Sequence, residues 1–281
     1  MNFFDNQIDL KAYLSEISDP KSTIGFVPTM GALHAGHLSL MKQSLRDNSI
    51  SVVSIFVNPT QFNNQLDLEK YPRTLENDIK IIKSLSEKII VYAPTVADVY
   101  ETDVKSFHFC FDGLENQMEG KFRPGHFDGV GTVVKKLFEI VSPKKAYFGE
   151  KDFQQLQIIK KLVEKNNLNV QIIGCPIARE ANGLAMSSRN ERLMAGDRQA
   201  ASIIFETLEK AKKQFQKLPI QVVKDMVTKT FFNNSTFKLE YFEIAKEATL
   251  ESIQPKSARK QYRGFIAVLC GEVRLIDTMK F

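Results

Sequence analysis

Two histidines, His34 and His37, stand three positions apart in the segment PTMGALHAGH, which begins at residue 28. This spacing lets both imidazoles share one face of a helix. The segment follows a short β-rich run and precedes helical apolar spacing, so it should lie at a helix start, where backbone N–H groups favour anions. Gly36 has no side chain and lets a phosphate approach the backbone. These residues predict a phosphate site. The alternative is a pair of ordinary histidines at a helix start.

Two further segments place polar groups directly after expected strands. Asn58 and Gln61 supply amides after a buried strand, although Asn58 followed by proline could also form a simple capped turn. Lys151 can act as a point charge toward phosphate. Asp152 suits either a helix N-cap or a ribose hydroxyl. Both pairs are therefore candidates for ligand contacts.

A fourth segment, MSSR at residues 186–189, combines two hydroxyls with a guanidinium. Such a set could form a mobile clamp for a leaving pyrophosphate. The tetrapeptide is weak when taken alone. Zinc is not expected at the histidines, because no suitable third ligand lies close in the sequence.

The spacing of apolar residues predicts the elements that must position these groups. Near-continuous apolar runs are typical of strands buried on both faces of a parallel sheet. Strands are expected at residues 23–28, 50–57, 89–93, 107–111, 146–148 and 170–173, and helices at 11–17, 38–45, 75–85, 130–141 and 153–163. Alternating strands and helices predict a doubly wound α/β domain, whose ligands lie beyond the carboxyl ends of the strands.

The pattern changes in the last third of the chain. Helices are expected at residues 195–215 and 222–232, followed by strands at 239–244, 265–269 and 273–276 with no helices between them. We therefore expect an α/β domain over residues 1–180 and a smaller α+β domain over residues 181–281.

Composition narrows the class of protein. The 281 residues are 43% hydrophobic and 25% charged, an ordinary globular balance. The net charge of +5 is mild and spread along the chain, so nucleic-acid binding is not expected. We expect no membrane span and no secretory signal. Three widely spaced cysteines indicate neither a disulfide framework nor a zinc site, and together these features predict a cytoplasmic protein.

Six segments, taken together, resemble the pantothenate synthetase (pantoate–β-alanine ligase) family of the HxGH nucleotidylyltransferase superfamily. They occur in the family's order and read PTMGALHAGH, SIFVNPTQF, YPRT, FRPGHFDGV, FGEKDFQQL and GLAMSSRN. The resemblance implies a Rossmann-like domain for ATP and pantoate, a C-terminal lid domain and a homodimer. It also implies the ATP-dependent condensation of (R)-pantoate with β-alanine through a pantoyl adenylate, releasing AMP and pyrophosphate.

The resemblance also implies roles for individual residues. Those implied to contact ATP are Met30, Gly31, His34, Gly36, His37, Gly149, Lys151, Asp152, Ala178, Met186, Ser187, Ser188 and Arg189. Among these, His37, His34 and Lys151 are implied to be catalytic, with His37 as the acid toward the leaving group. Those implied to bind pantoate or β-alanine are Gln61, Gln155, Asn58, Arg123 and His126. His126 could equally have a structural role.

A magnesium ion is expected with ATP, and Asp78 is the candidate ligand. Members of the family often carry an acid just before this position, where the chain has Asn77, and another acid where it has Asn182. The alternative for Asp78 is a solvated residue on a helix.

Three other functions remain open at this point. A related nucleotidyltransferase would join CTP or ATP to a phosphorylated alcohol and release no AMP. A nucleotide-sensing protein should have lost Lys151 or the clamp, and an RNA-binding protein should show a basic patch with aromatic residues. The pair Gln61 and Gln155, together with the GEKD segment, favours the ligase.

Overall fold

The structure is a computed structural model, and it describes residues 1–62, 65–253 and 260–281. The chain divides into two compact units. The first comprises Met1–Glu115, Glu119–Gly149 and Gln155–Cys175, and the second comprises Asn116–Met118, Glu150–Gln154 and Pro176–Phe281. The main division thus falls after Cys175, whereas the sequence suggested a boundary at residues 180–181. The second unit also includes two short segments from earlier in the chain.

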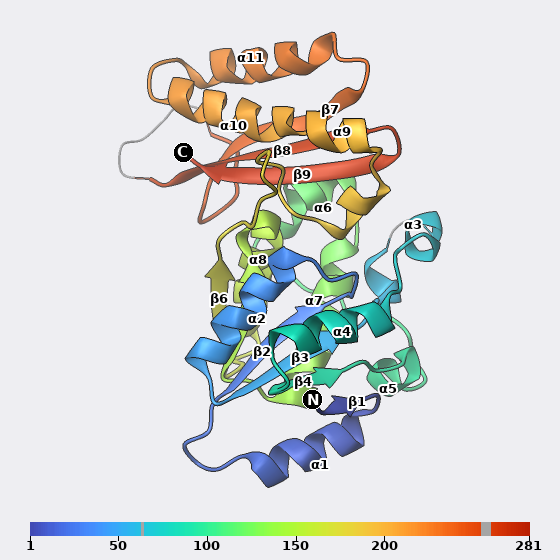
Figure 1. The fold of residues 1–281 in the computed structure, drawn as a ribbon. Helices are drawn as coiled ribbons and strands as arrows, with labels where there is room; N and C mark the ends of the chain where they lie inside the picture. The colour runs from blue at the N-terminus through green and yellow to red at the C-terminus, as the bar shows by residue number, and fades with distance from the viewer. Residues whose placement is uncertain (63–64, 254–259) are drawn as a thin grey trace. The chain divides into compact units, whose positions relative to one another are not determined.

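A six-stranded parallel sheet forms the first unit, with strand order β1-β4-β3-β2-β5-β6 (Figure 1). The strands are β1 Phe3–Phe4, β2 Ile24–Thr29, β3 Ile50–Ile55, β4 Ile89–Tyr92, β5 Lys145–Gly149 and β6 Gln171–Cys175. The chain runs outward from β2 in one direction and from β5 in the other, so the strand order reverses between these neighbours. This reversal is the topological switch point at which doubly wound sheets bind ligands.

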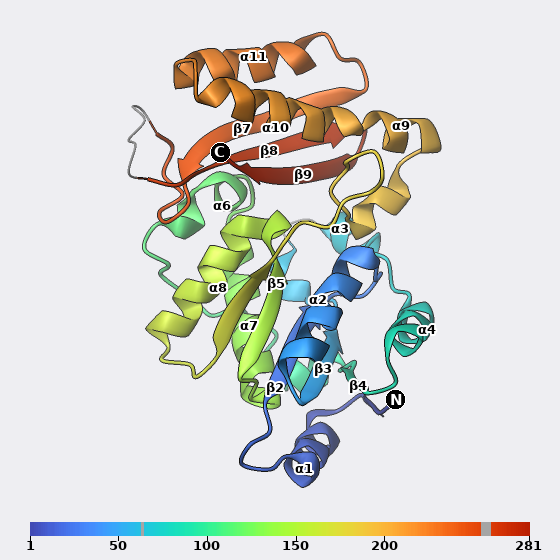
Figure 2. The ribbon, with the colours of Figure 1, turned by 60° about the vertical axis from the view of Figure 1, so that its left-hand side comes forward.

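Helices flank both faces of this sheet (Figure 2). The elements that alternate with its strands along the chain are α1 Gln7–Ile17, α2 Ala35–Asp47, η1 Pro59–Gln61, α3 Gln65–Glu69, α4 Leu75–Leu85, α5 Val96–Tyr100, η2 Leu114–Asn116, α6 Met118–Phe122, α7 His126–Val141, η3 Glu150–Asp152 and α8 Phe153–Lys165. Met41 of α2 and Ile82 of α4 share a buried cluster with Val53 of β3. Val27 of β2 belongs to the same cluster, whereas the ring of the adjacent Phe26 meets Phe138 of α7 edge-on, with centroids 6.2 Å apart. Alternate strand residues therefore pack against different helices, as a sheet covered on both faces requires.

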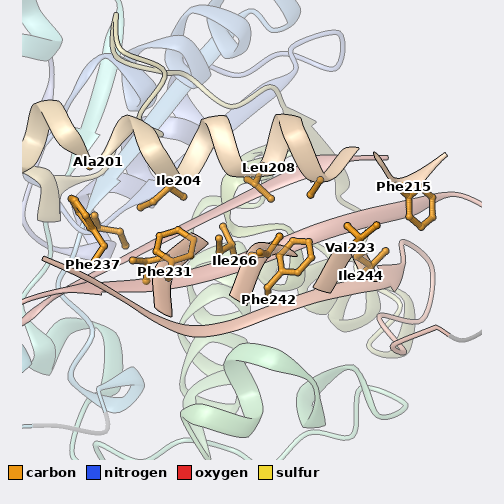
Figure 3. Close-up of a cluster of buried hydrophobic side chains, with 14 of the residues drawn as sticks. Ala201, Ile204, Leu208, Phe215, Val223, Phe231, Phe237, Phe242, Ile244 and Ile266 are labelled. Carbon is orange, nitrogen blue, oxygen red and sulfur yellow. The ribbon is translucent and has the colours of Figure 1, made fainter. Parts of the chain in front are cut away.

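The second unit is α+β, as expected. Its strands β7 Phe237–Lys246, β8 Tyr262–Cys270 and β9 Val273–Lys280 pair antiparallel in the order β7-β8-β9. Its helices are η4 Ser188–Arg192, α9 Ala195–Ala200, α10 Ser202–Phe215 and α11 Ile220–Phe232. Figure 3 shows Ile204 and Leu208 pointing from α10 toward the sheet, where they join Ile266 of β8 in one buried cluster. Removing this apolar surface from water holds the helices on the sheet.

Two local predictions differ from the structure, and one short strand was not predicted. The expected helix at residues 195–215 divides at Ala201, and the short β1 was not foreseen. The expected strand at residues 107–111 is wrong, because side chains rather than a neighbouring strand bind its backbone. The N–H groups of Phe107 and Phe109 donate to Thr132 Oγ1 at 2.8 Å and Asp128 Oδ1 at 3.0 Å. Within the described ranges, no helix combines the length and apolarity that crossing a membrane would require.

Candidate active site

The histidine turn follows β2 and opens helix α2, at one side of the switch point. His34 is the N-cap of α2, and His37 occupies the third helical position. The Gly36 N–H donates to His34 Nδ1 at 3.1 Å, and the His34 N–H donates to His37 Nδ1 at 3.3 Å. The two rings lie side by side with centroids 4.1 Å apart. The imidazoles therefore form a reciprocal capping box, a role normally taken by hydroxyl and carboxylate side chains.

This capping box determines which ring nitrogen can donate to a ligand. A backbone N–H can only donate, so the Nδ1 atoms of His34 and His37 must act as acceptors. The proton of each neutral ring is therefore on Nε2. In this tautomer the Nε2–H group of each ring can donate to a phosphate oxygen.

Asp78 of α4 holds the turn that leads to the histidines. Its side chain is fully buried, and its carboxylate accepts the Ala32 N–H at 3.0 Å and the Leu33 N–H at 2.7 Å. Gly31 and Ala32 have positive φ values of 79° and 48°, the left-handed region that is costly for alanine. The buried carboxylate satisfies the N–H groups that this tight turn directs inward. Asp78 is thus neither a solvated helix residue nor an exposed ligand.

Gln61 lies beside the same turn, on η1 after strand β3. Its Nε2 donates to Met30 Sδ at 2.8 Å, and its Oε1 accepts from Asn58 Nδ2 at 3.2 Å. Asn58 is the N-cap residue of η1, but its side chain makes no cap bond, so the simple capped turn does not explain it. Tyr100 Oη donates to Asn58 Oδ1 at 2.6 Å and thereby fixes the orientation of that amide.

Helix α7 supports η1 from behind. His126 Nδ1 contacts the Gln61 carbonyl oxygen at 2.8 Å, and Arg123 Nη1 contacts His126 Nε2 at 3.2 Å. Because arginine only donates and a carbonyl only accepts, His126 carries its proton on Nδ1. A Cβ added at Gly129 would lie 2.4 Å from the Thr60 carbonyl oxygen, so only glycine permits this approach. His126 and Arg123 therefore reach the backbone of Gln61, which supports the structural alternative for His126.

The GEKDFQQ segment links β5 to α8. Gly149 ends β5 in the first unit, and Gln155 lies partly exposed in α8 of the same unit. Lys151 and Asp152 belong to the second unit. Their side chains pair with each other at 3.3 Å, and Lys151 is the less exposed of the two. The sequence motif is contiguous, but its residues are divided between the two units.

The MSSR segment belongs to the second unit and is held by its own hydrogen bonds. The Met186 N–H donates to the Ala178 carbonyl oxygen at 2.9 Å. Ser187 caps η4 by accepting the Arg189 N–H at 3.3 Å, and Ser188 is buried. The Ala178 carbonyl therefore pairs with the backbone of the segment that leads into residues 186–189.

The expected site residues are divided between the two units. Those in the first unit are Met30, Gly31, His34, Gly36, His37, Asn58, Gln61, Asp78, Arg123, His126, Gly149 and Gln155. Those in the second unit are Lys151, Asp152, Ala178, Met186, Ser187, Ser188 and Arg189. The contact between Met30 and Gln61 joins the histidine turn to the amides. The supporting roles of Tyr100 and Asp78 were missed, because neither carries a local sequence signal for its distant partner.

Known proteins resemble this chain over its whole length. The sequence matches the profile of the family described as pantoate-beta-alanine ligase over residues 2–280. A protein named pantothenate synthetase from Flavobacterium psychrophilum is 61% identical over 279 residues, covering 99% of both chains. Another of that name, from Christiangramia forsetii, is 52% identical, with 99% of this chain and 98% of the relative covered.

Solved structures agree with this assignment. Pantothenate synthetase from Thermus thermophilus superposes with a TM-score of 0.91 at 34% identity, covering 100% of this chain and 99% of that one. A pantoate-beta-alanine ligase from Francisella tularensis, described as complexed with beta-gamma ATP and beta-alanine, has a TM-score of 0.77 at 35% identity, with 100% and 97% covered. Full-length matches at these identities, on a fold with the histidine turn at its switch point, place this chain in the pantoate–β-alanine ligase family.

Proposed function

We propose that this chain condenses (R)-pantoate with β-alanine to form pantothenate, consuming ATP and releasing AMP and pyrophosphate. Membership of the family supports the reaction, and the Francisella relative is described as complexed with beta-gamma ATP and beta-alanine. The observation that carries the proposal is the contact of Gln61 Nε2 with Met30 Sδ at 2.8 Å. This contact supports the proposal, because the amide proposed to bind the acid lies beside the turn proposed to bind the phosphates.

The first step activates the acid. The pantoate carboxylate attacks the α-phosphorus of ATP, the bond to the bridging oxygen breaks, and pyrophosphate leaves with its electron pair. Catalysis of such a transfer is mainly positioning and charge stabilisation. The Nε2–H groups of His34 and His37 donate to phosphate oxygens, with His37 toward the leaving group. The charge that develops on pyrophosphate is assigned to Lys151 and the clamp of Ser187, Ser188 and Arg189. Nucleoside contacts are assigned to Met30, Gly149 and Asp152.

Neutral amides suit the acid for an electrostatic reason. Gln61 and Gln155 can orient the pantoate carboxylate and hydroxyls by hydrogen bonds without neutralising the nucleophile. An arginine would bind the carboxylate more tightly and lower its nucleophilicity. Gln61→Arg should therefore slow the adenylation step. Normal turnover by this variant would contradict the explanation.

The second step forms the amide bond. The neutral amine of β-alanine attacks the acyl carbon of pantoyl adenylate, AMP leaves with the bonding electrons, and the amine loses a proton. The adenylate is prone to hydrolysis, so a site that excludes water protects it. We propose that the C-terminal unit acts as the lid and that the MSSR segment becomes ordered when ATP binds.

Magnesium is proposed as the companion of ATP, held by the phosphates. Asp78 does not fit as a direct ligand in the described geometry, since both its oxygens accept backbone N–H groups. No group of three metal-binding side chains occurs among the residues that the structure describes. We therefore assign no catalytic step to the ion.

Two wider properties complete the proposal. We propose a homodimer, supported by exposed Val104 and Phe107 in the extended segment that packs on α7. We also propose a cytoplasmic location, which suits the free thiols of Cys110, Cys175 and Cys270.

Exchange of labelled pyrophosphate into ATP tests the reaction. Exchange that requires pantoate but not β-alanine would support the adenylate step. Subsequent addition of β-alanine should release AMP rather than ADP. Exchange without pantoate, or a requirement for a phosphorylated alcohol, would instead indicate the alternative nucleotidyltransferase.

A further inference from the structure

Arg263 is a buried arginine on the central strand of the C-terminal sheet. It lies in β8, paired with Ala245 of β7 and Lys280 of β9, and is only 5% exposed. Its Nε donates to Glu247 Oε1 at 2.8 Å, and its Nη2 donates to Glu150 Oε2 at 3.1 Å. A guanidinium removed from water needs such partners, so both carboxylates compensate its burial.

The same guanidinium also packs on an aromatic ring. Arg263 Cζ lies 3.9 Å from the ring centroid of Phe153, within the range of a cation–π contact. Phe153 is buried, and its ring packs against Phe265 of β8 with centroids 6.1 Å apart. Arg263 therefore pairs with Glu150 and packs on Phe153, and these two residues flank Lys151 and Asp152 in the sequence.

The Glu150–Gln154 segment is continuous in sequence with β5 and α8, yet it groups with the second unit. Besides Arg263, a further contact holds its far end, where Gln154 Nε2 donates to the Gln117 carbonyl oxygen at 2.8 Å. Between these anchors Lys151 pairs only loosely with Asp152, at 3.3 Å. Burial raises the pKa of the Asp277 carboxyl in β9, and the Arg179 guanidinium and, more weakly, the Lys151 charge oppose this shift.

We propose that Arg263 is a positioning residue, which fixes the Lys151 ammonium by holding Glu150 and Phe153 against the C-terminal sheet. The position of Lys151 is then set by β8 rather than by the strand and helix that it joins in sequence. The inference rests on the proposed function, in which Lys151 stabilises charge on the leaving pyrophosphate.

The geometry distinguishes this role from simple stabilisation of the sheet. Glu247 and Glu150 share one guanidinium, but only Glu150 belongs to the segment that carries Lys151. A residue that merely stabilised the fold would affect the reaction equally whether or not Lys151 is present. A residue that acts through Lys151 loses its effect once the ammonium is removed.

A double-mutant cycle on pantoate-dependent pyrophosphate exchange tests the proposal. Arg263→Met keeps most of the side-chain volume but removes the guanidinium. We expect about a 10²-fold loss of exchange rate, which is the effect of displacing a catalytic group such as the Lys151 ammonium by about 1 Å. Lys151→Met should cost on the order of 10²–10³-fold. The double variant should resemble Lys151→Met alone, because a shared mechanism makes the effects non-additive. Multiplicative losses would overturn the proposal.

Arg274 offers a matched control on the next strand. It donates to Glu240 Oε2 at 2.6 Å and lies 6.0 Å from the Tyr241 ring, so it combines an acid and an aromatic partner in the same sheet. Arg274→Met should change exchange by no more than about twofold and multiply with Lys151→Met, as independent sites do. A loss like that of Arg263→Met would overturn the assignment.

If Arg263→Met does not fold by circular dichroism, Glu150→Gln takes its place in the cycle, because it removes the charge partner while keeping the shape. The same non-additivity is then expected, and multiplicative losses would again refute the proposal. If the parent protein shows no pantoate-dependent exchange, the proposed function fails and this role falls with it. If the parent protein is active but the losses of the single variants multiply in the double variant, only the positioning role is refuted.

Discussion

Arg179 and Asp277 form a bidentate ion pair between segments 98 residues apart in the chain. Arg179 Nη1 lies 2.6 Å from Asp277 Oδ2, Nη2 lies 3.0 Å from Oδ1, and the aspartate side chain is only 2% exposed. The guanidinium also packs 4.3 Å from the Phe205 ring centroid and donates to the Gly183 carbonyl oxygen. The pair thus ties the strand-like segment before MSSR to strand β9.

We expect Asp277→Asn to destabilise the protein strongly. Removing one partner of a buried ion pair leaves an uncompensated charge and costs about 3–5 kcal/mol. Urea unfolding measures the loss. Asp225→Asn is the control, because Asp225 is exposed on α11 and should change the free energy of unfolding by less than about 0.5 kcal/mol. Equal stability of the two variants would contradict the burial argument.

Asp78→Asn should disturb the histidine turn. The amide retains one acceptor and turns an NH₂ group toward backbone donors, so about 1–3 kcal/mol of stability should be lost. Pyrophosphate exchange should fall by about 10²-fold as the imidazoles shift. Glu76→Gln, in the exposed first turn of the same helix, is the control. Recovery of activity at high magnesium would favour a metal-binding role for Asp78 over the positioning role.

The capping box makes a spectroscopic prediction for the ring nitrogens. Nitrogen-15 spectra should show protons on Nε2 in His34 and His37, and on Nδ1 in His126. The contrast follows from backbone donors at the first two rings and a carbonyl acceptor at the third. An Nδ1–H tautomer at His34 would show that the cap is not formed.

Tyr100→Phe should weaken pantoate binding selectively. The loss of the hydrogen bond to Asn58 frees the amide that orients Gln61, so KM for pantoate should rise several-fold while KM for ATP stays constant. One such bond is worth about 0.5–1.5 kcal/mol. Tyr92→Phe removes a comparable buried hydroxyl that donates to Asp98 at 2.6 Å. That control should lower stability and leave pantoate binding unchanged. The same rise in KM in both variants would point to general loosening.

His108 should titrate above the usual histidine range. A hydrogen bond to Asp128, followed by the charge of that carboxylate, raises the pKa of His108. The protonated ring therefore stabilises the folded protein. This contribution is fully present below the pKa of the unfolded state, and it is lost as the pH rises through the pKa of the folded state. Proton NMR can follow the ring, and Asp128→Asn should return its pKa toward the ordinary value. No change in this variant would exclude Asp128 as the cause.

Local sequence signals predicted much of the fold, and they singled out Met30 and Gln61, whose side chains the structure brings into contact. Apolar runs located β3 and β4, and the change of rhythm located the α+β unit, because burial on one or both faces leaves a pattern within a few residues. The segment 107–111 alternates like a strand, but the backbone N–H groups of Phe107 and Phe109 donate to side chains of α7 instead of pairing with a neighbouring strand. Long-range pairs could not be foreseen. Glu150 and Arg263 are 113 residues apart, and no local pattern connects them.

The bare Cα of Gly129 has a consequence for selectivity. It lets the 16-residue α7 rest directly on the carbonyl of Thr60, next to Gln61, leaving no slack between helix and turn. The residue whose amide is proposed to bind pantoate is consequently held by direct backbone packing against α7. We therefore expect this close backbone contact to disfavour a bulkier acid without the need for a blocking side chain.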